Sequence, residues 1–284
     1  MTNKILLVAL LVALTLLAYM GFHPTETSGS HKETAFERVM RTGTIRCGYG
    51  IWIPEMVKDA NTGALSGVDY DIMNAVGHAL GLKVEWTEEV GWPVAQQGLA
   101  SGRYDVFCNG AWPTPSRTKT AFYSRPFMYS PVYAAISAKK NVSTQDISWA
   151  NKPETTIAVL PNTAIDTFAN SRFPNAKKFD LSDLSNDGDL MLAIATGKAD
   201  MGLSTYSSIK KYMDANPGQI HINDQPVIYA PGSFLLPHDD YRLKHMVDFT
   251  ITYLLEMGVI RNILMKDLPD SQHDWRYPAV EHEP

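Results

Sequence analysis

The sequence predicts an α/β fold in which two layers of similar organisation face each other across a cleft. Patterns typical of strands and helices alternate from residue 44 onward, and the alternation begins again at residue 156. Such alternation is typical of largely parallel sheets covered by helices. Between the two series, the extended apolar residues 126–137 indicate a crossing between the layers. Ligands of open α/β sheets bind beyond the carboxyl ends of the strands, so this arrangement favours capture of a small molecule by domain closure.

In the first layer, the longest helix is predicted from Ile72, Val76 and Leu80, which share one helical face, and Gly81 ends it. The elements expected in this layer are strands at 44–48, 83–88 and 106–108, a loop at 49–65, and helices at 68–80 and 93–101.

In the second layer, each strand is again followed by a turn and a helix. The expected elements are strands at 156–160, 178–180 and 200–203, a helix after the turn at 161–163, and helices at 187–196 and 206–216. A last strand at 233–236 and two terminal helices at 243–257 and 259–268 follow this layer.

The N-terminus is predicted to lie outside this fold. Lys4 precedes an apolar run at residues 5–20, a pattern typical of an export signal. We interpret residues 1–22 as a signal peptide or N-terminal anchor and the polar residues 23–36 as a linker. The globular part is therefore expected to be exported from the cytoplasm, either soluble after cleavage or tethered by residues 5–22.

The composition argues against several classes of protein. The chain has 284 residues, of which 45% are hydrophobic and 19% charged, with a formal net charge of −5. No basic cluster indicates a nucleic-acid surface. No metal-binding or catalytic motif is found, so we expect no metal, no cofactor and no catalytic residue. Cys47 and Cys108 each lie near the end of a predicted strand; they could pair outside the cytoplasm or remain two small buried side chains.

The stretch from Gly102 to Phe127 is the most informative about chemistry. A short buried strand at 106–108 ends at Asn109-Gly110, and Pro113 and Pro115 lead into a predicted helix whose first turn contains Arg117. The guanidinium group of arginine binds a carboxylate through two parallel N–H donors. We therefore predict a small-anion site at Arg117.

Several short motifs occur in a recognisable order and spacing. They are Gly63-Ala-Leu-Ser-Gly-Val-Asp-Tyr-Asp71, Ser101-Gly-Arg-Tyr-Asp-Val106, Thr114-Pro-Ser-Arg117, Tyr123-Ser-Arg-Pro-Phe127 and Gly197-Lys-Ala-Asp200. With these motifs the chain resembles the family 3 extracellular solute-binding proteins, the periplasmic amino-acid-binding components of ABC importers.

The resemblance implies a type II periplasmic binding fold, a two-lobe Venus flytrap with two hinge crossings. Lobe 1 is expected at residues 37–131 plus 231–284 and lobe 2 at residues 132–230. The implied protein is a monomer that closes on its ligand and delivers it to an inner-membrane ABC permease, and it is not an enzyme.

The resemblance also implies roles for individual residues. Arg117 matches the family's carboxylate-binding arginine, and the turn Asn162-Thr163-Ala164 matches a turn that offers N–H groups to the same carboxylate. Thr163 could be a helix N-cap, a ligand contact or both. The family's ammonium-binding acid falls on Thr205, and a small hydroxyl residue of the family falls on Trp112. The ammonium half of the site thus lacks its charge.

Aromatic residues replace this charge in the predicted site. The loops at the strand ends of lobe 1 contain Tyr49, Trp52, Trp92 and Trp112, and Gly110 precedes the last of these. Each aromatic residue alone could belong to the core. Together they predict a small carboxylate ligand with an aromatic, apolar or methylated-ammonium remainder. The alternatives are a periplasmic enzyme of the cyclohexadienyl dehydratase type and a membrane-anchored ligand sensor.

Overall fold

The computed structural model describes residues 12, 15, 32–182, 185–268 and 273–278. Its chain divides into two units, residues 1–33 and 34–284. Apart from residues 12 and 15, the predicted signal or anchor segment lies outside the described residues. No helix in the described part has both the length and the apolar character that crossing a membrane requires.

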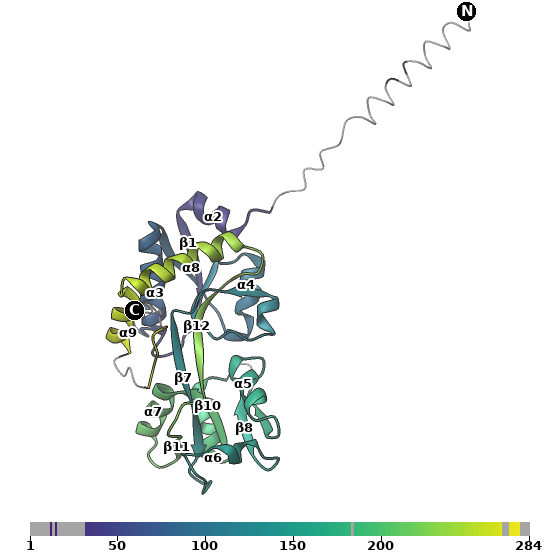
Figure 1. Cartoon of the computed structure of the whole chain (residues 1–284), viewed down its shortest axis with the longest axis vertical. Coiled ribbons are helices and arrows are strands. Elements are labelled where there is room, and N and C mark those ends of the chain that lie inside the picture. The colour runs from purple at the N-terminus through teal and green to yellow at the C-terminus, as the bar shows by residue number, and fades with distance from the viewer. Residues whose placement is uncertain (1–11, 13–14, 16–31, 183–184, 269–272, 279–284) are drawn as a thin grey trace, which may run out of the picture. The chain divides into compact units, whose positions relative to one another are not determined.

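In residues 34–284, strands and helices alternate through both layers, as predicted (Figure 1). The strands are β1 (Thr44–Tyr49), β2 (Val57–Lys58), β3 (Leu65–Ser66), β4 (Lys83–Glu89), β5 (Val106–Ala111), β6 (Ala121–Tyr123), β7 (Met128–Ser137), β8 (Thr156–Val159), β9 (Lys177–Asp180), β10 (Met201–Thr205), β11 (Ile220–Ile222) and β12 (Ile228–Pro237). The helices are α2 (Ala35–Thr42), α3 (Val68–Leu80), α4 (Ala95–Ser101), α5 (Ala164–Arg172), α6 (Asp187–Thr196), α7 (Tyr206–Ala215), α8 (Tyr241–Glu256) and α9 (Val259–Asp267), with the short 3-10 helices η1 (Trp92–Val94), η2 (Arg117–Lys119) and η3 (Ser148–Asn151).

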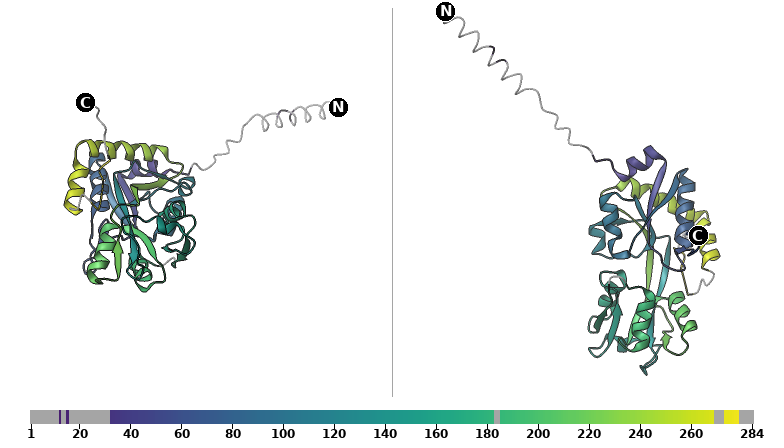
Figure 2. Two further views of the ribbon diagram at one scale, coloured as in Figure 1. Left: turned by 60° about the horizontal axis from the view of Figure 1, so that its bottom comes forward. Right: turned by 180° about the vertical axis from the view of Figure 1, so that it is seen from behind.

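Two long strands connect the layers. Strands β7 and β12 pair in antiparallel fashion, and the main path of the sheet runs β4-β1-β5-β12-β7-β10-β8-β9. The three strands at each end of this path are parallel to one another. The right view of Figure 2 shows helices grouped around each end, with β7 and β12 between the groups. The predicted crossing at 126–137 is therefore strand β7 and the segment that leads into it.

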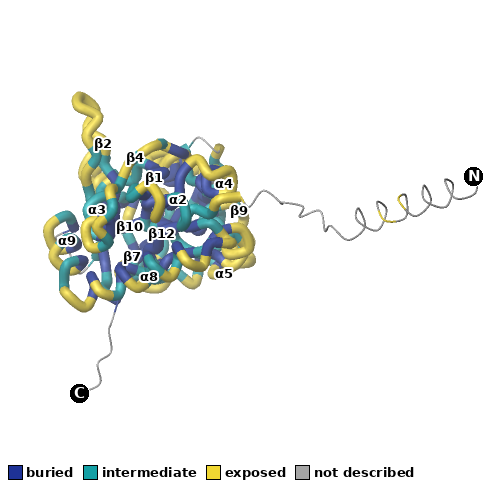
Figure 3. The backbone as a smooth tube through the Cα atoms, turned by 90° about the horizontal axis from the view of Figure 1, so that it is seen from above, coloured by how far each residue is buried: buried dark blue, intermediate teal, exposed yellow. Residues whose placement is uncertain are grey.

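The buried side chains form separate hydrophobic clusters on the two sides of this connection. Two clusters come from the strands and helices before β7 together with the C-terminal helices and residues of β7 and β12. Two others come from the segment between β7 and β12, with residues of both strands. Figure 3 shows buried strands in the middle and exposed loops around them. Each half thus has its own core, which supports the lobe boundaries that we propose, and we keep the names lobe 1 and lobe 2.

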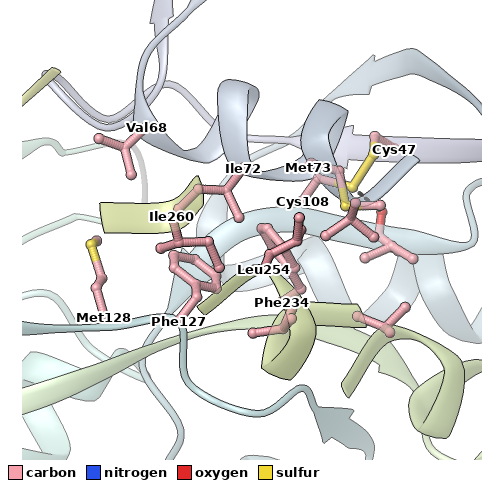
Figure 4. Packing of buried hydrophobic residues seen from close by; sticks show 14 of the residues in the cluster. Cys47, Val68, Ile72, Met73, Cys108, Phe127, Met128, Phe234, Leu254 and Ile260 are labelled. Atoms are coloured by element: carbon pink, nitrogen blue, oxygen red, sulfur yellow. Dashed lines mark hydrogen bonds between the residues drawn. A yellow bond between two sulfur atoms is a disulfide. The ribbon is translucent and has the colours of Figure 1, made fainter. Parts of the chain in front are cut away.

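The core of lobe 1 contains a disulfide between Cys47 on β1 and Cys108 on β5 (Figure 4). Both cysteines are fully buried among apolar side chains such as Ile72 and Met73. The sequence left open whether these cysteines pair; in the structure they do. The bond joins two adjacent parallel strands just before the loops that follow them.

Some elements begin or end at residues other than those predicted. Helix α2 begins at Ala35, because Thr34 forms a capping box with Glu37, so the predicted linker at 23–36 overlaps its first turn. Strand β5 continues through Asn109 and Gly110, where we expected its end. Arg117 lies in a 3-10 helix of three residues instead of a regular helix. These differences move the start of the fold and the end of one strand by a few residues.

Candidate functional site

A cavity of ≈320 Å³ lies between the ends of the strands of lobe 1 and the first turns of α5 and α6 in lobe 2. Seven predicted site residues line it: Trp52, Trp92, Gly110, Trp112, Arg117, Thr163 and Ala164. Met128 and Ser130, at the start of β7, line it from the connection between the lobes. Residues separated by more than a hundred positions in the sequence therefore meet where the fold predicts a ligand.

Arg117 faces the start of α5 across this cavity. Its Nη2 donates a hydrogen bond of 2.7 Å to the carbonyl oxygen of Asn162. Asn162 has a φ of 63°, in the left-handed region that asparagine tolerates better than most residues. The turn thereby directs its carbonyl toward lobe 1 and is followed directly by the helix. Guanidinium donors and the amides of a helix N-terminus are both suited to an anion.

The hydroxyl of Thr163 already has two partners. It accepts a hydrogen bond of 3.3 Å from the backbone N–H of Asp166 and donates one of 2.7 Å to the carbonyl of Leu160. Thr163 is therefore the N-cap of α5. Helix geometry leaves the first amides without partners inside the helix, so Ala164 and Ile165, which line the cavity, present the donors there.

Three tryptophans surround the cavity in two groups. Trp52 and Trp92 meet edge to face, with ring centroids 6.0 Å apart at 80°. Trp112 instead reaches lobe 2 and stacks on Phe168 of α5, with centroids 6.2 Å apart at 25°. The predicted convergence of tryptophans is thus found, and one of them contacts the opposite lobe.

Two predicted site residues do not line the cavity. Tyr49 is buried, and its ring meets the edge of Trp86 in the core of lobe 1. Thr205 is also buried, at the end of β10, and its hydroxyl lies 3.4 Å from that of Ser207. The structure places both residues behind the cavity wall.

Two cavity residues were missed in the sequence. Glu55 and Asp69 both line the cavity, although they are only 6% and 2% exposed. Burial, with the nearby Asp69 as the second cause, raises the pKa of Glu55 to about 8. Burial also raises the pKa of Asp69 to about 7, against the effect of hydrogen bonds from Gly110 and Asn109. The signal for Glu55 was an acid within the apolar loop Trp52-Ile53-Pro54-Glu55-Met56.

The family model for bacterial extracellular solute-binding proteins, family 3, matches residues 45–267, which include every cavity residue described above. The chain belongs to this family. The predicted resemblance is therefore confirmed.

Relatives of this family 3 solute-binding protein agree with that conclusion. A probable amino-acid ABC transporter-binding protein of Haemophilus influenzae is 35% identical over 102 residues, which are 36% of this chain and 39% of that protein. A probable amino-acid-binding protein of Bacillus subtilis, YxeM, is 21% identical over 206 residues, 72% of this chain and 76% of that protein. The homologues are binding proteins, as predicted, and not enzymes.

Solved structures show the same fold. The ancestral amino acid-binding protein AncCDT-1, a precursor of cyclohexadienyl dehydratase, superposes with a TM-score of 0.68 at 24% identity, over 82% of this chain and 98% of that one. The type II periplasmic binding fold predicted for the family 3 protein is thus confirmed.

Proposed function

We propose that the protein captures an amino acid or a related small carboxylate in the periplasm and delivers it to an inner-membrane ABC permease. Membership of the solute-binding family supports this, as does the name of the Haemophilus relative. The observation on which the proposal depends is the position of Arg117, which faces the first turn of α5 and bonds to Asn162 there.

In this proposal Arg117 and the amides of Ala164 and Ile165 bind the ligand carboxylate from opposite lobes. A ligand that contacts both lobes binds the closed arrangement more tightly than the open one, so it shifts the protein toward closure. The lobes would move about β7 and β12, the two strands that connect them. The permease then recognises the closed monomer.

The tryptophans would enclose the remainder of the ligand. Trp52 and Trp92 provide apolar surface on lobe 1, and Trp112 reaches across the cavity to Phe168. Aromatic faces pack well on apolar or flat groups. Apolar enclosure also excludes water, which strengthens the charged hydrogen bonds to the carboxylate.

Calorimetry on purified protein tests the proposal. A thermal-shift screen with the common amino acids and aromatic acids selects the probe, because a ligand at 100 times its dissociation constant stabilises the fold by about 2.7 kcal/mol. We expect Arg117→Ala to weaken binding of that probe by at least ~100-fold.

Arg103→Ala is the matched control. Arg103 is another lobe 1 arginine, but it pairs with Glu88 on the surface and does not line the cavity. Its removal should leave affinity unchanged. Tight binding by the Arg117→Ala variant would contradict the proposed function.

A further inference from the structure

Two acidic side chains in the cavity have an oxygen atom that lacks a hydrogen-bond partner. These atoms are Oε2 of Glu55 and Oδ1 of Asp69, both buried. Within the described residues, neither side chain forms an ion pair. Buried polar atoms are nearly always satisfied, so two such acceptors on one cavity wall indicate that a partner binds there.

The two side chains are held next to each other by the backbone. The N–H of Asp69 donates a hydrogen bond of 3.0 Å to the carbonyl of Glu55. This close approach requires glycine at position 67, where φ is 111° and an added Cβ would lie 2.5 Å from the Glu55 carbonyl oxygen. The loop of Glu55 is thus fixed against the first turn of α3.

Only one oxygen of Asp69 is used by the protein itself. Its Oδ2 accepts hydrogen bonds of 3.1 Å from the amide side chain of Asn109 and 3.0 Å from the backbone N–H of Gly110. These two donors orient the carboxyl group from β5. They leave Oδ1 beside Gly110, at the surface of the cavity.

We propose that the free oxygens of Glu55 and Asp69 bind a nitrogen cation of the ligand that has N–H groups, either an ammonium or a guanidinium. This inference rests on the proposed function, in which Arg117 binds the carboxylate of the same molecule. A quaternary ammonium has no N–H donor and would leave both acceptors unsatisfied. The negative charge missing at Thr205 in lobe 2 is then replaced by a pair of acids in lobe 1.

Binding of such a cation should release protons. Glu55 holds a proton at neutral pH, because burial and Asp69 raise its pKa to about 8, and Asp187 and Asp274 act in the same direction. Asp69 has a pKa raised by burial to about 7. Arg117, the positive group of the same cavity, bonds to Asn162 instead of either acid. A bound cation favours the ionised forms, so affinity should rise with pH.

Four small-molecule probes distinguish which nitrogen group of a ligand the two acids bind. L-Lysine has a carboxylate and two amines, L-norleucine has only the α-ammonium, 6-aminohexanoate has only the terminal ammonium, and glycine betaine has no N–H. Each is titrated by calorimetry into the wild type, Glu55→Gln and Glu89→Gln. The last variant is the control, because Glu89 pairs with Lys58 on the surface of lobe 1.

We expect Glu55→Gln to weaken L-lysine binding by at least ~30-fold, while Glu89→Gln leaves it unchanged. Between pH 6 and 8, wild-type affinity for L-lysine should rise by up to ~tenfold per pH unit for each proton released, and Glu55→Gln should flatten this rise. A selective loss of L-norleucine binding identifies the α-ammonium as the bound group; a selective loss of 6-aminohexanoate binding identifies the side-chain cation. Either result supports the inference.

The failures are distinguishable. If the wild type binds L-lysine but Glu55→Gln binds it equally well, and Asp69→Asn does too, the cation subsite is wrong and the proposed function stands. An equal loss of glycine betaine binding in Glu55→Gln would also overturn the subsite, since that probe cannot donate a hydrogen bond. If the wild type binds none of the four probes or any amino acid of the screen, both proposals are wrong. Circular dichroism confirms that each variant is folded.

Discussion

The two walls of the cavity differ in charge. Lobe 1 contributes all the charged residues that line the described cavity, namely Glu55, Asp69 and Arg117. Lobe 2 contributes neutral residues, among them Thr163 and Asn186 at the first turns of two helices. This difference suggests that lobe 1 binds the charged groups of the ligand through side chains, and that lobe 2 completes the site with backbone amides.

A partly buried acid also exists in lobe 2, but its environment is different. Both oxygens of Asp187 accept hydrogen bonds from Ser204, at 2.9 and 2.7 Å. Burial still raises its pKa, while the serine donors oppose the shift. Asp187 therefore has partners within its own lobe, whereas Glu55 and Asp69 each retain an oxygen for a ligand.

The largest expected effect is on the pH dependence of stability. Unfolded Glu55 loses its proton near its usual pKa of 4.5, whereas the folded protein keeps that proton up to about pH 8. In that window the native state binds more protons than the unfolded state, so the free energy of unfolding falls as pH rises. Each pKa unit corresponds to about 1.4 kcal/mol, so the fall due to Glu55 is roughly 5 kcal/mol at most.

Urea unfolding at pH 5, 6.5 and 8 measures this slope without ligand. Glu55→Gln should remove much of it, and Glu89→Gln, an exposed acid, should leave it in place. Equal slopes in wild type and Glu55→Gln would show that the lobe 1 acid is ionised in the empty protein, and the contrast between the walls would then be smaller.

The next effect concerns the position of Glu55. Gly67→Ala places a side chain 2.5 Å from the Glu55 carbonyl at a φ of 111°. We expect a loss of ~2–3 kcal/mol in stability and weaker binding of L-lysine, because the loop of Glu55 must move. Gly63→Ala is the matched control, since its φ of 71° is also positive but nothing lies within 4 Å of an added Cβ.

The control should cost only about 1 kcal/mol, the usual strain of a left-handed residue, and should leave affinity unchanged. Urea unfolding and calorimetry on both variants give the two values. Equal losses of stability with equal affinities would mean that the contact between Gly67 and Glu55 does not position the acid.

The smallest effect comes from the aromatic contact between the walls. Phe168→Leu removes the stack on Trp112 but keeps an apolar side chain, so affinity should fall by about 2- to 10-fold, equivalent to ~0.5–1.5 kcal/mol. A double-mutant cycle with Trp112→Leu isolates the pair. Phe122→Leu, which loses a ring contact with Tyr241 inside lobe 1, should lower stability alone.

Zero coupling energy in this cycle would show that the two rings act independently. Trp112 would then contribute to binding without help from its contact with Phe168 of lobe 2.

The sequence was sufficient to predict the fold and to predict Arg117 and the turn at Asn162, which the structure brings together. Alternating periodicity predicted the two layers. The turn before Arg117 predicted an anion-binding group, and the family resemblance added the turn at Asn162, which the structure places across the same cavity. Residues next to glycine and proline turns are easy to place, because proline fixes φ and glycine permits the positive φ that many turns require.

The acidic residues of the cavity, Glu55 and Asp69, could not be predicted, because what distinguishes them is burial by tertiary packing. Asp69 lies in the first turn of α3 and resembles any acid at such a position, and Glu55 lies in a loop without periodicity. Their burial results from packing of the Glu55 loop against the first turn of α3 and of Asp69 against Asn109 and Gly110 of β5. Tyr49 and Thr205 each lie at a strand end, are buried and do not line the cavity. Successive side chains of a strand point to opposite faces, so a position at a strand end does not by itself bring a residue to the cavity.

The disulfide between Cys47 and Cys108 bears on where in the cell the protein completes its folding. It joins β1 and β5, and the segments that follow these strands contain Trp52 and Glu55 on one side and Trp112 and Arg117 on the other. Thiols in the cytoplasm stay reduced, whereas disulfides form and persist outside it. The disulfide behind the lobe 1 wall of the cavity is therefore expected to form only after secretion. The protein would then acquire this crosslink in the same compartment as its ligand.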